Sequence, residues 1–137
     1  MNSTNMTLEY YNCNAADFTA STLNVDFQEN QNRFLKMLNR GDLILDFGCG
    51  TGVLGILSCK REAKSAIGID IDNWSVECAK NNCKLNNVDN FEILLGDSML
   101  LNNLNKQFDI IFANINRNII LSDMERYVKV LKNGGDI

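Results

Sequence analysis

The part of the sequence with the clearest chemistry is DFGCGTGVLG, residues 46 to 55. Its glycines follow the apolar run LIL and precede a second apolar run. In that arrangement a backbone turns sharply after a strand and presents the N-terminus of a helix to a ligand. Asp70 lies 20 residues after Gly50, where a carboxylate can accept hydrogen bonds from ribose hydroxyls. The pattern predicts a binding site for a nucleoside-containing cofactor.

Two classes of cofactor fit these glycines equally well. From Gly50 the loop is GTGVLG, the G-x-G-x-x-G of dinucleotide-binding domains, and from Asp46 it is D-x-G-x-G-x-G. A dinucleotide would bring its pyrophosphate dianion against the Asp46 carboxylate, an opposition of roughly a kcal/mol or more. S-adenosylmethionine carries two cations instead, an ammonium and a sulfonium. Asp46 therefore favours S-adenosylmethionine, with an NAD-type oxidoreductase as the alternative. The alternative for Asp46 is a structural role, in which its carboxylate only accepts hydrogen bonds from the amides of the loop.

Alternating apolar segments supply the elements that would position this loop. Hydrophobic periodicity predicts strands at residues 43–47, 65–69, 91–95 and 108–113, helices at 53–60, 73–86 and 120–131, and a short helix or turn at 98–105. Strands that alternate with helices through short links favour a parallel sheet with right-handed crossovers. The predicted fold is a Rossmann-like, doubly wound α/β domain.

The chain divides into two parts on this interpretation. Residues 1–40 form an N-terminal arm, which could close over the cofactor, and a helix from Asp26 to Asn39. Residues 41–137 form the cofactor-binding core. The segment NGG at 133–135 is predicted to stop the last helix, so the chain should end where a fifth strand begins. The core would then lack its last strands, and the fourth strand would expose an apolar edge through which copies of the chain could associate.

Composition narrows the function. The chain has 137 residues, 45% hydrophobic and 22% charged, which is typical of one soluble domain. Its net charge of −4 and pI of about 4.7 argue against a nucleic-acid partner. There is no apolar run of membrane-spanning length and no signal peptide, so a cytoplasmic protein without a membrane partner is expected. Five cysteines without a C-x-x-C pair, and no histidine, argue against a zinc site, a disulfide framework and histidine-based catalysis.

Longer motifs carry a family resemblance. The segments LILDFGCGTGVLGI, AIGIDIDNWSVECAKNNCKLNNV, LLGDS, FDIIFANINRNIIL and YVKVLKNGG occur in the order, and near the spacing, of class I S-adenosylmethionine-dependent methyltransferases. Over about residues 41–137 the chain looks most like the bacterial methyltransferases of ribosomal protein L-eleven. Its N-terminal arm resembles small methyltransferases of the tellurite-resistance type. The separate substrate-recognition domain and the histidine-containing glycine segment of the L-eleven family have no counterpart in this sequence.

The resemblance implies residues for the methionine end of the cofactor. The residues that would line it are Asp46, Gly48, Cys49, Gly50 and Gly52. Cys49 is expected to contribute mainly its backbone, because a small residue in a tight turn explains it and no base for a nucleophilic thiol is in view. No metal ligand is expected in this site.

The resemblance also implies residues for the nucleoside end. Asp70 would hold the two ribose hydroxyls and Ile71 would lie against the adenine. Asp97 would accept a hydrogen bond from the adenine amine, with Ser98 supplying a backbone N–H. Asp72 is better explained as the N-cap of the following helix. Trp74 could shield the adenine, but packing in the core or at the surface is the favoured explanation.

The resemblance assigns Asn114, at the end of the fourth strand, to catalysis. Its carbonyl oxygen could accept hydrogen bonds from an attacking amine and align the amine with the methyl group, a step that gains mostly from orientation. Here ANINR replaces the N-P-P-[YF] of relatives that methylate planar amines, which favours a lysine or N-terminal amine. The methyl acceptor could be a protein or a small molecule, and the base could be water, a carboxylate or nothing in the protein. A fragment that binds cofactor without activity is the alternative.

Overall fold

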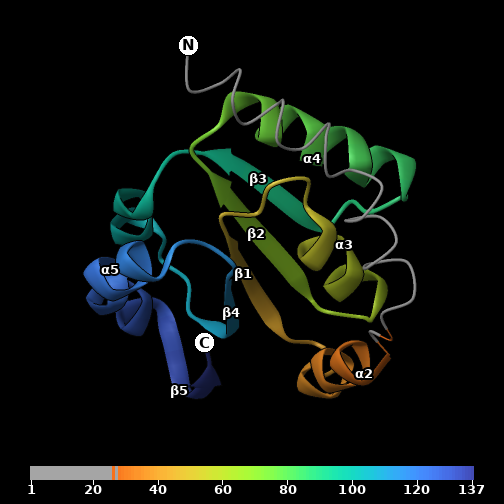
Figure 1. Ribbon diagram of the computed structural model, residues 1–137, viewed down its shortest axis with the longest axis horizontal. Helices are drawn as coiled ribbons and strands as arrows, with labels where there is room; N and C mark the ends of the chain where they lie inside the picture. Colours follow the sequence, from red (N-terminus) through yellow and green to blue (C-terminus); the bar gives the residue numbers. More distant parts are fainter. Residues whose placement is uncertain (1–25, 27) are drawn as a thin grey trace, which may run out of the picture. The chain divides into compact units, whose positions relative to one another are not determined.

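The computed structural model of this protein describes residue 26 and residues 28–137 (Figure 1). The chain divides into two compact units between Met37 and Leu38. In the first unit the structure describes helix α2, Gln28–Met37, which is shorter at both ends than the helix predicted there. The predicted arm, residues 1–22, lies outside the described residues.

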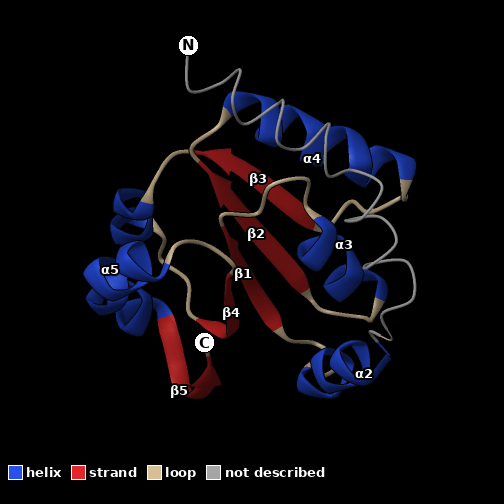
Figure 2. Cartoon of the chain, in the orientation of Figure 1, coloured by secondary structure: helices blue, strands red, loops and turns tan. Residues whose placement is uncertain are grey.

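A five-stranded parallel sheet forms the centre of the second unit (Figure 2). The strands stand in the order β3-β2-β1-β4-β5, and every neighbouring pair is parallel. They are β1 (Leu43–Phe47), β2 (Ser65–Asp70), β3 (Phe91–Leu95), β4 (Phe108–Ala113) and β5 (Leu131–Asp136). The direction of winding reverses between β1 and β4, and ligands of such sheets bind at the carboxyl ends of the strands beside that point. The predicted doubly wound α/β fold is confirmed.

Helices cover both faces of this sheet (Figure 1). They are α3 (Val53–Lys60), α4 (Asn73–Leu85), the 3₁₀ helix η1 (Ser98–Asn103) and α5 (Arg117–Val130). Successive side chains of β1 point to opposite faces. Phe47 packs against Tyr127 of α5, with ring centroids 5.3 Å apart, whereas Asp46 accepts a hydrogen bond from α3. Helices α3 and α5 therefore cover opposite faces of the sheet, with Asp46 on the α3 side.

Local sequence sets most of the boundaries in the second unit. Strands β1, β3 and β4 and helix α3 span the residues predicted for them. The Asp72 carboxylate accepts a hydrogen bond of 2.9 Å from the Ser75 N–H and so caps α4, as predicted. No helix in the described part of the chain is long and apolar enough to cross a lipid bilayer.

The C-terminal residues correct the prediction. Helix α5 ends at Val130, before the NGG segment, and the chain continues as β5. Phe108 of β4 pairs with Leu131 and Ile110 pairs with Asp136, so the register shifts between them. Gly134 lies in this irregular stretch with φ of +78°, a conformation that glycine adopts without strain. The prediction that the chain stops before a fifth strand is wrong, because pairing with β4 outweighs the weak strand propensity of KNGG.

This fifth strand also changes the expected association surface. Strand β4 lies between β1 and β5, so both of its edges are paired. The prediction of an exposed fourth-strand edge is therefore wrong, and an oligomer formed through that edge has no basis in this structure.

Candidate functional site

The loop between β1 and α3 lies at the carboxyl end of β1 and is closed by backbone hydrogen bonds. The N–H groups of Gly48 and Cys49 both donate to the Ile69 carbonyl, at 2.7 and 3.1 Å. The Gly52 N–H donates to the Cys49 carbonyl at 2.8 Å, which closes a tight turn. Gly48, Gly50 and Gly52 have φ of +70°, +53° and +82°, in the left-handed region. The predicted glycines therefore hold a preformed turn at the carboxyl edge of the sheet.

Gly48 is also the point where a second strand end contacts this loop. A Cβ atom at Gly48 would lie 2.1 Å from Cγ2 of Ile115, in the segment after β4. The Ile115 side chain therefore packs directly on the glycine backbone, and no larger residue fits at position 48. Asn114, the predicted catalytic residue, precedes Ile115 and is exposed. The structure thus brings the segment that carries Asn114 into contact with the cofactor loop.

Asp46 is a buried carboxylate at the end of β1, with 2% of its surface exposed. Its Oδ2 accepts a hydrogen bond of 3.1 Å from the Gly55 N–H in the first turn of α3, not from the amides of the loop. Burial raises the pKa of Asp46 to about 6, the Gly55 N–H opposes this rise, and the charge of Asp70 adds to it. The carboxylate is still mostly ionised at pH 7, and a nearby cation would relieve its unfavourable burial.

Asp70 ends β2 and connects it to the glycine loop. Its Oδ2 accepts a hydrogen bond of 2.8 Å from the Gly50 N–H, and its Oδ1 accepts one of 3.0 Å from the Asp72 N–H. Each oxygen of a carboxylate has two lone pairs, so each can accept a further bond from a ligand. Asp70 therefore contacts the tip of the turn and helps to hold it, and its carboxylate can still accept hydrogen bonds from a ligand.

The charges around the loop are unbalanced. Within the described residues, neither Asp46 nor Asp70 forms an ion pair with a lysine or arginine. The ion pairs that the structure shows there are Arg40–Glu62, Lys80–Glu77, Arg126–Asp123 and Lys132–Asp109. That part of the chain also contains no cluster of three side chains that could hold a metal ion. The negative charge of Asp46 and Asp70 beside the loop is therefore not balanced by a lysine or arginine among the described residues.

Cys49 does not have the properties of a nucleophile. Its side chain is buried, and burial together with the charges of Asp46 and Asp70 raises the pKa of the thiol to about 12. A thiol with that pKa stays protonated at neutral pH and reacts slowly. What Cys49 offers the turn is its backbone N–H and carbonyl, both of which are hydrogen-bonded.

Exposed apolar side chains follow the ends of β2 and β3. Ile71 and Trp74 are 77% and 70% exposed, and Leu95 and Met99 are also exposed. The Gly96 N–H donates to the Asp70 carbonyl at 2.9 Å, so the two strand ends are joined. Large exposed apolar side chains near the Asp70 carboxylate could pack against a flat aromatic ring of a ligand. Because Trp74 is exposed, packing in the core is excluded, and packing at the surface remains the prediction for it.

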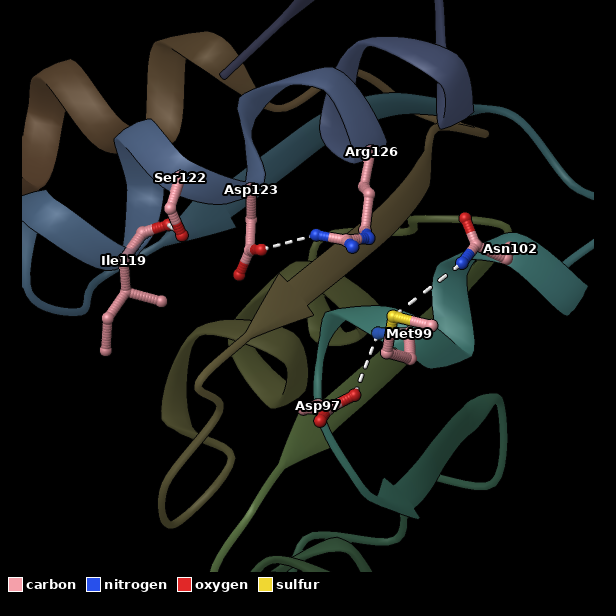
Figure 3. A network of polar contacts seen from close by, with 7 residues as sticks. All are labelled: Asp97, Met99, Asn102, Ile119, Ser122, Asp123 and Arg126. Atoms are coloured by element: carbon pink, nitrogen blue, oxygen red, sulfur yellow. Dashed lines mark hydrogen bonds and ion pairs between the residues drawn. The ribbon is translucent and has the colours of Figure 1, made fainter.

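Asp97 and Ser98 begin η1, directly after β3. The Asp97 Oδ1 accepts a hydrogen bond of 2.8 Å from the Met99 N–H and caps η1 (Figure 3). This bond occupies one of its two carboxylate oxygens. Ser98 is buried. Both residues therefore lie at the carboxyl edge of the sheet with the other predicted site residues, and Asp97 has a local structural role as well.

Sequence reasoning missed two contacts of the glycine loop. The Asn82 side chain on α4 donates a hydrogen bond to the Thr51 carbonyl, 31 residues away in sequence, and Ile115 packs on Gly48. The one signal for Asn82 is its place on the helix, three residues after the buried Ala79. A polar residue bordering the apolar face of a helix often bonds to a neighbouring segment, but the sequence does not say to which one.

The fold and these contacts define a class of protein. A parallel sheet of this order, with an acidic glycine loop after β1 and an acid at the end of β2, is that of a class I S-adenosylmethionine-dependent methyltransferase domain. A family model described as ribosomal protein L11 methyltransferase (PrmA) matches residues 24–137. The chain belongs to this family.

Individual relatives agree with the family model. The chain is 45% identical over 98 residues to the ribosomal protein L11 methyltransferase of Phocaeicola vulgatus, covering 72% of this chain and 34% of that protein. It is 46% identical over 103 residues to that of Porphyromonas gingivalis, covering 75% and 35%. The chain thus spans about a third of the length of the curated relatives it matches.

Solved structures give the same fold. The ribosomal protein L11 methylase of Lactobacillus delbrueckii subsp. bulgaricus superposes with a TM-score of 0.69 at 28% identity, covering 77% of this chain and 54% of that one. Trm5b of Pyrococcus abyssi also gives a TM-score of 0.69 at 28% identity, covering 80% and 32%. A methyltransferase of Thiobacillus denitrificans, solved with S-adenosyl-L-homocysteine, has a TM-score of 0.66 at 20% identity and shows the fold alone.

Proposed function

We propose that this chain binds S-adenosylmethionine and forms the cofactor-binding part of a methyltransferase that acts on an amine nitrogen of a protein. The observation that carries the proposal is the pair of carboxylates at the glycine turn. Asp46 is buried beside the turn and Asp70 bonds to its tip, and neither has a cationic partner in the described residues. Two carboxylates favour a ligand with an ammonium and a sulfonium and oppose a pyrophosphate.

The positions of the residues suggest how the cofactor would be held. The methionine end would lie along Gly48, Cys49, Gly50 and Gly52, with Asp46 as the negative charge behind them. Asp70 would accept hydrogen bonds from the ribose hydroxyls with the lone pairs that its two backbone bonds leave.

The adenine would lie beyond the ribose, toward β3. Ile71 is exposed there and could cover one face of the ring. Asp97 could accept from the exocyclic amine with the oxygen that does not cap η1, and the Ser98 N–H could donate to a ring nitrogen. In this arrangement the adenine contacts come from β2 and β3, and the methionine contacts come from β1.

Bound S-adenosylmethionine would supply a methyl group activated by its sulfonium. The protein would contribute mostly position: the Asn114 carbonyl would accept a hydrogen bond from the acceptor amine and direct its lone pair along the line of the S–CH₃ bond. The N–C bond would form as the S–C bond breaks, with S-adenosylhomocysteine as the leaving group. An alkylammonium acceptor must lose its proton first, and with no histidine in the chain, water or a carboxylate would take it.

The proposed methyl acceptor is an amine of a ribosomal protein. The relatives from Phocaeicola vulgatus and Porphyromonas gingivalis are named as methyltransferases of ribosomal protein L11, and this chain belongs to their family. The sequence ANINR after β4 supports an alkyl amine over a planar one, because it lacks the proline-aromatic pair of the N-P-P-[YF] motif. A lysine side chain or N-terminal amine of a ribosomal protein fits both observations.

Calorimetry on the intact chain tests the choice of cofactor. S-adenosylmethionine and S-adenosylhomocysteine should both bind, and NAD should give no heat beyond dilution. The expected difference comes from the Asp46 and Asp70 carboxylates, which meet a cation in the first ligand and a pyrophosphate in NAD. Tight binding of NAD with no response to the other two would overturn the proposal in favour of a dinucleotide oxidoreductase.

Transfer of a labelled methyl group tests activity and acceptor together. The chain, with labelled S-adenosylmethionine, should label ribosomal protein L11 and leave a version with all its amines blocked by acetylation unlabelled. Labelling of small amines but not of the protein would contradict the protein acceptor. Cofactor binding without transfer to any acceptor would identify the chain as a binding unit that needs further parts of a longer protein.

A further inference from the structure

Helix α4 forms one wall of the glycine turn. Asn82 Nδ2 donates a hydrogen bond of 2.9 Å to the carbonyl oxygen of Thr51, the third residue of the turn that the Gly52 N–H closes onto Cys49. Three residues earlier on the same helix, Ala79 lies so close that a Cβ at Gly52 would be 3.2 Å from its Cβ. The middle of α4 therefore contacts the turn both through an apolar contact and through a directed hydrogen bond.

The same turn is held from its other side by Asp70. The Gly50 N–H donates to Asp70 Oδ2 at 2.8 Å, while the Thr51 carbonyl accepts from Asn82. These two side-chain bonds fix the two residues at the tip of the turn, one through its N–H and the other through its carbonyl. The orientation of the peptide groups that would face the cofactor depends on both.

We propose that Asn82 is a positioning residue for the cofactor: through the Thr51 carbonyl it holds the glycine turn in the conformation that binds S-adenosylmethionine. The proposal rests on the proposed function of the loop. Asn82 does not contact the ligand itself. It sets in advance the turn geometry that binding would otherwise have to order, and ordering a flexible loop lowers affinity.

The contacts of Asn82 separate this role from general stability. The residue is half-buried on α4 and Thr51 is exposed, so water can replace the lost donor when Asn82 is changed. Alanine is also a better residue than asparagine inside a helix, which favours folding of the variant. Loss of the Asn82 bond should therefore leave the fold intact and loosen the turn.

Asn86, the C-cap residue of the same helix, provides a matched control. Its Nδ2 also donates a 2.9 Å hydrogen bond to a backbone carbonyl, that of Asn82, and does not contact the glycine loop. Asn82→Ala and Asn86→Ala therefore each remove one asparagine-to-carbonyl bond of the same length. Asn82→Leu, which keeps the branch at Cγ and removes no side-chain volume, separates the hydrogen bond from packing.

The experiment measures S-adenosylhomocysteine affinity by calorimetry on the intact chain. Asn82→Ala and Asn82→Leu should weaken the Kd about three- to tenfold, the usual effect of one hydrogen bond, and Asn86→Ala should leave it unchanged. Hydrogen exchange of the Gly52 amide, in the absence of ligand, should accelerate by a similar factor in the two Asn82 variants only, because its bond to the Cys49 carbonyl closes the same turn.

The outcomes separate this proposal from the proposed function. If the unaltered chain does not bind S-adenosylhomocysteine, the cofactor assignment fails, and with it the premise of this role. If the unaltered chain binds and the Asn82 variants bind equally well, the positioning role is wrong while the cofactor assignment stands. Equal losses of affinity in the Asn82 and Asn86 variants would also overturn it, since α4 as a whole would then be responsible.

Discussion

Asp109 near the amino end of β4 and Asp46 at the carboxyl end of β1 lie on neighbouring strands, with opposite surroundings. The Asp109 carboxylate accepts bonds from Lys132 Nζ at 2.8 and 2.9 Å and from the Leu43 N–H at 2.8 Å. Burial alone would raise its pKa, but these donors hold the pKa below its usual range. Asp46 has one N–H donor, and burial raises its pKa to about 6.

The difference shows which end of the sheet is complete without a ligand. At the amino end, the lysine of β5 and the backbone of β1 satisfy the charge on β4. At the carboxyl end, a buried charge, a second carboxylate and exposed apolar side chains all stand where a cationic, partly aromatic ligand would satisfy them. The proposed function therefore predicts that removing a carboxylate weakens cofactor binding at the carboxyl end and leaves it unchanged at the amino end.

Gly48→Ala should give the largest effect. Its φ of +70° makes alanine unfavourable by about 1–2 kcal/mol, and the clash with Ile115 adds about 1–3 kcal/mol, so the free energy of unfolding should fall by about 2–5 kcal/mol. Gly134→Ala, in the bulge of β5, is the control, because its φ is +78° and nothing lies within 4 Å of the added Cβ. Urea denaturation compares the two. Equal losses would mean that Ile115 does not pack on the loop.

Asp70→Ala should come next, and its effect should appear in binding. The variant removes the proposed ribose acceptor and the partner of the Gly50 N–H, so S-adenosylhomocysteine should bind about 1.5–3 kcal/mol more weakly. Asp109→Ala should instead lower the free energy of unfolding by about 1–3 kcal/mol and leave the affinity unchanged. Calorimetry and denaturation on both variants test this crossing pattern. A loss of affinity in Asp109→Ala as large as that in Asp70→Ala would show that the two ends are not independent.

The sequence predicts those features of the structure that depend on residues close together in the chain. Strands β1, β3 and β4 match their predicted bounds because each is a short apolar run between turn or polar residues. The cap at Asp72 matches because it involves residues three apart. In contrast, β5 contains the segment KNGG, which has a weak strand propensity, and its extended form depends on pairing with β4. Local propensity therefore predicts a turn there instead of a strand.

The site shows the same limit. The glycines and Asp70 could be predicted from their spacing, and Asp97 from the family resemblance, because strand ends of a parallel sheet share one edge. The contacts that hold the loop could not, since Asn82 is 31 residues from Thr51 in sequence and Ile115, in the segment after β4, is 67 residues from Gly48. Such contacts depend on how α4 and the segment after β4 pack, which no local pattern specifies.

Asp46→Asn should sharpen the comparison through its pH dependence. The folded-state pKa of about 6 lies above the ordinary 3.8, so the folded protein holds this proton more tightly than the unfolded chain does. Ionised Asp46 therefore destabilises the fold above about pH 6, and this penalty disappears as the pH falls toward 3.8. The variant should raise the free energy of unfolding by about 1–3 kcal/mol at pH 7, and by almost nothing near pH 4.

The same variant should weaken binding of S-adenosylhomocysteine at pH 7, because it removes the charge behind the methionine end.

Asp109 has a lowered pKa, so its contribution to the free energy of unfolding has the opposite sign. This contribution is present at neutral pH and is lost as the pH falls through that lowered pKa. At pH 7, denaturation should therefore show a gain in the free energy of unfolding for Asp46→Asn and a loss for Asp109→Asn. At pH 4, which is still above the lowered pKa of Asp109, only the loss for Asp109→Asn should remain. A destabilised Asp46→Asn at pH 7 would contradict the account of a strained carboxylate.

Tyr127→Phe should have the smallest effect. It tests whether a buried polar group without a hydrogen-bond partner always belongs to the cofactor site. Tyr127 is fully buried against Phe47, and its hydroxyl has no hydrogen-bond partner in the described part of the chain. Burial and then the charge of Asp123 raise its pKa to about 12, so the hydroxyl stays neutral. Removing it should raise the free energy of unfolding by about 1 kcal/mol and leave cofactor affinity unchanged. Weaker binding would instead extend the ligand-dependent region from the carboxyl end of the sheet into the core under α5.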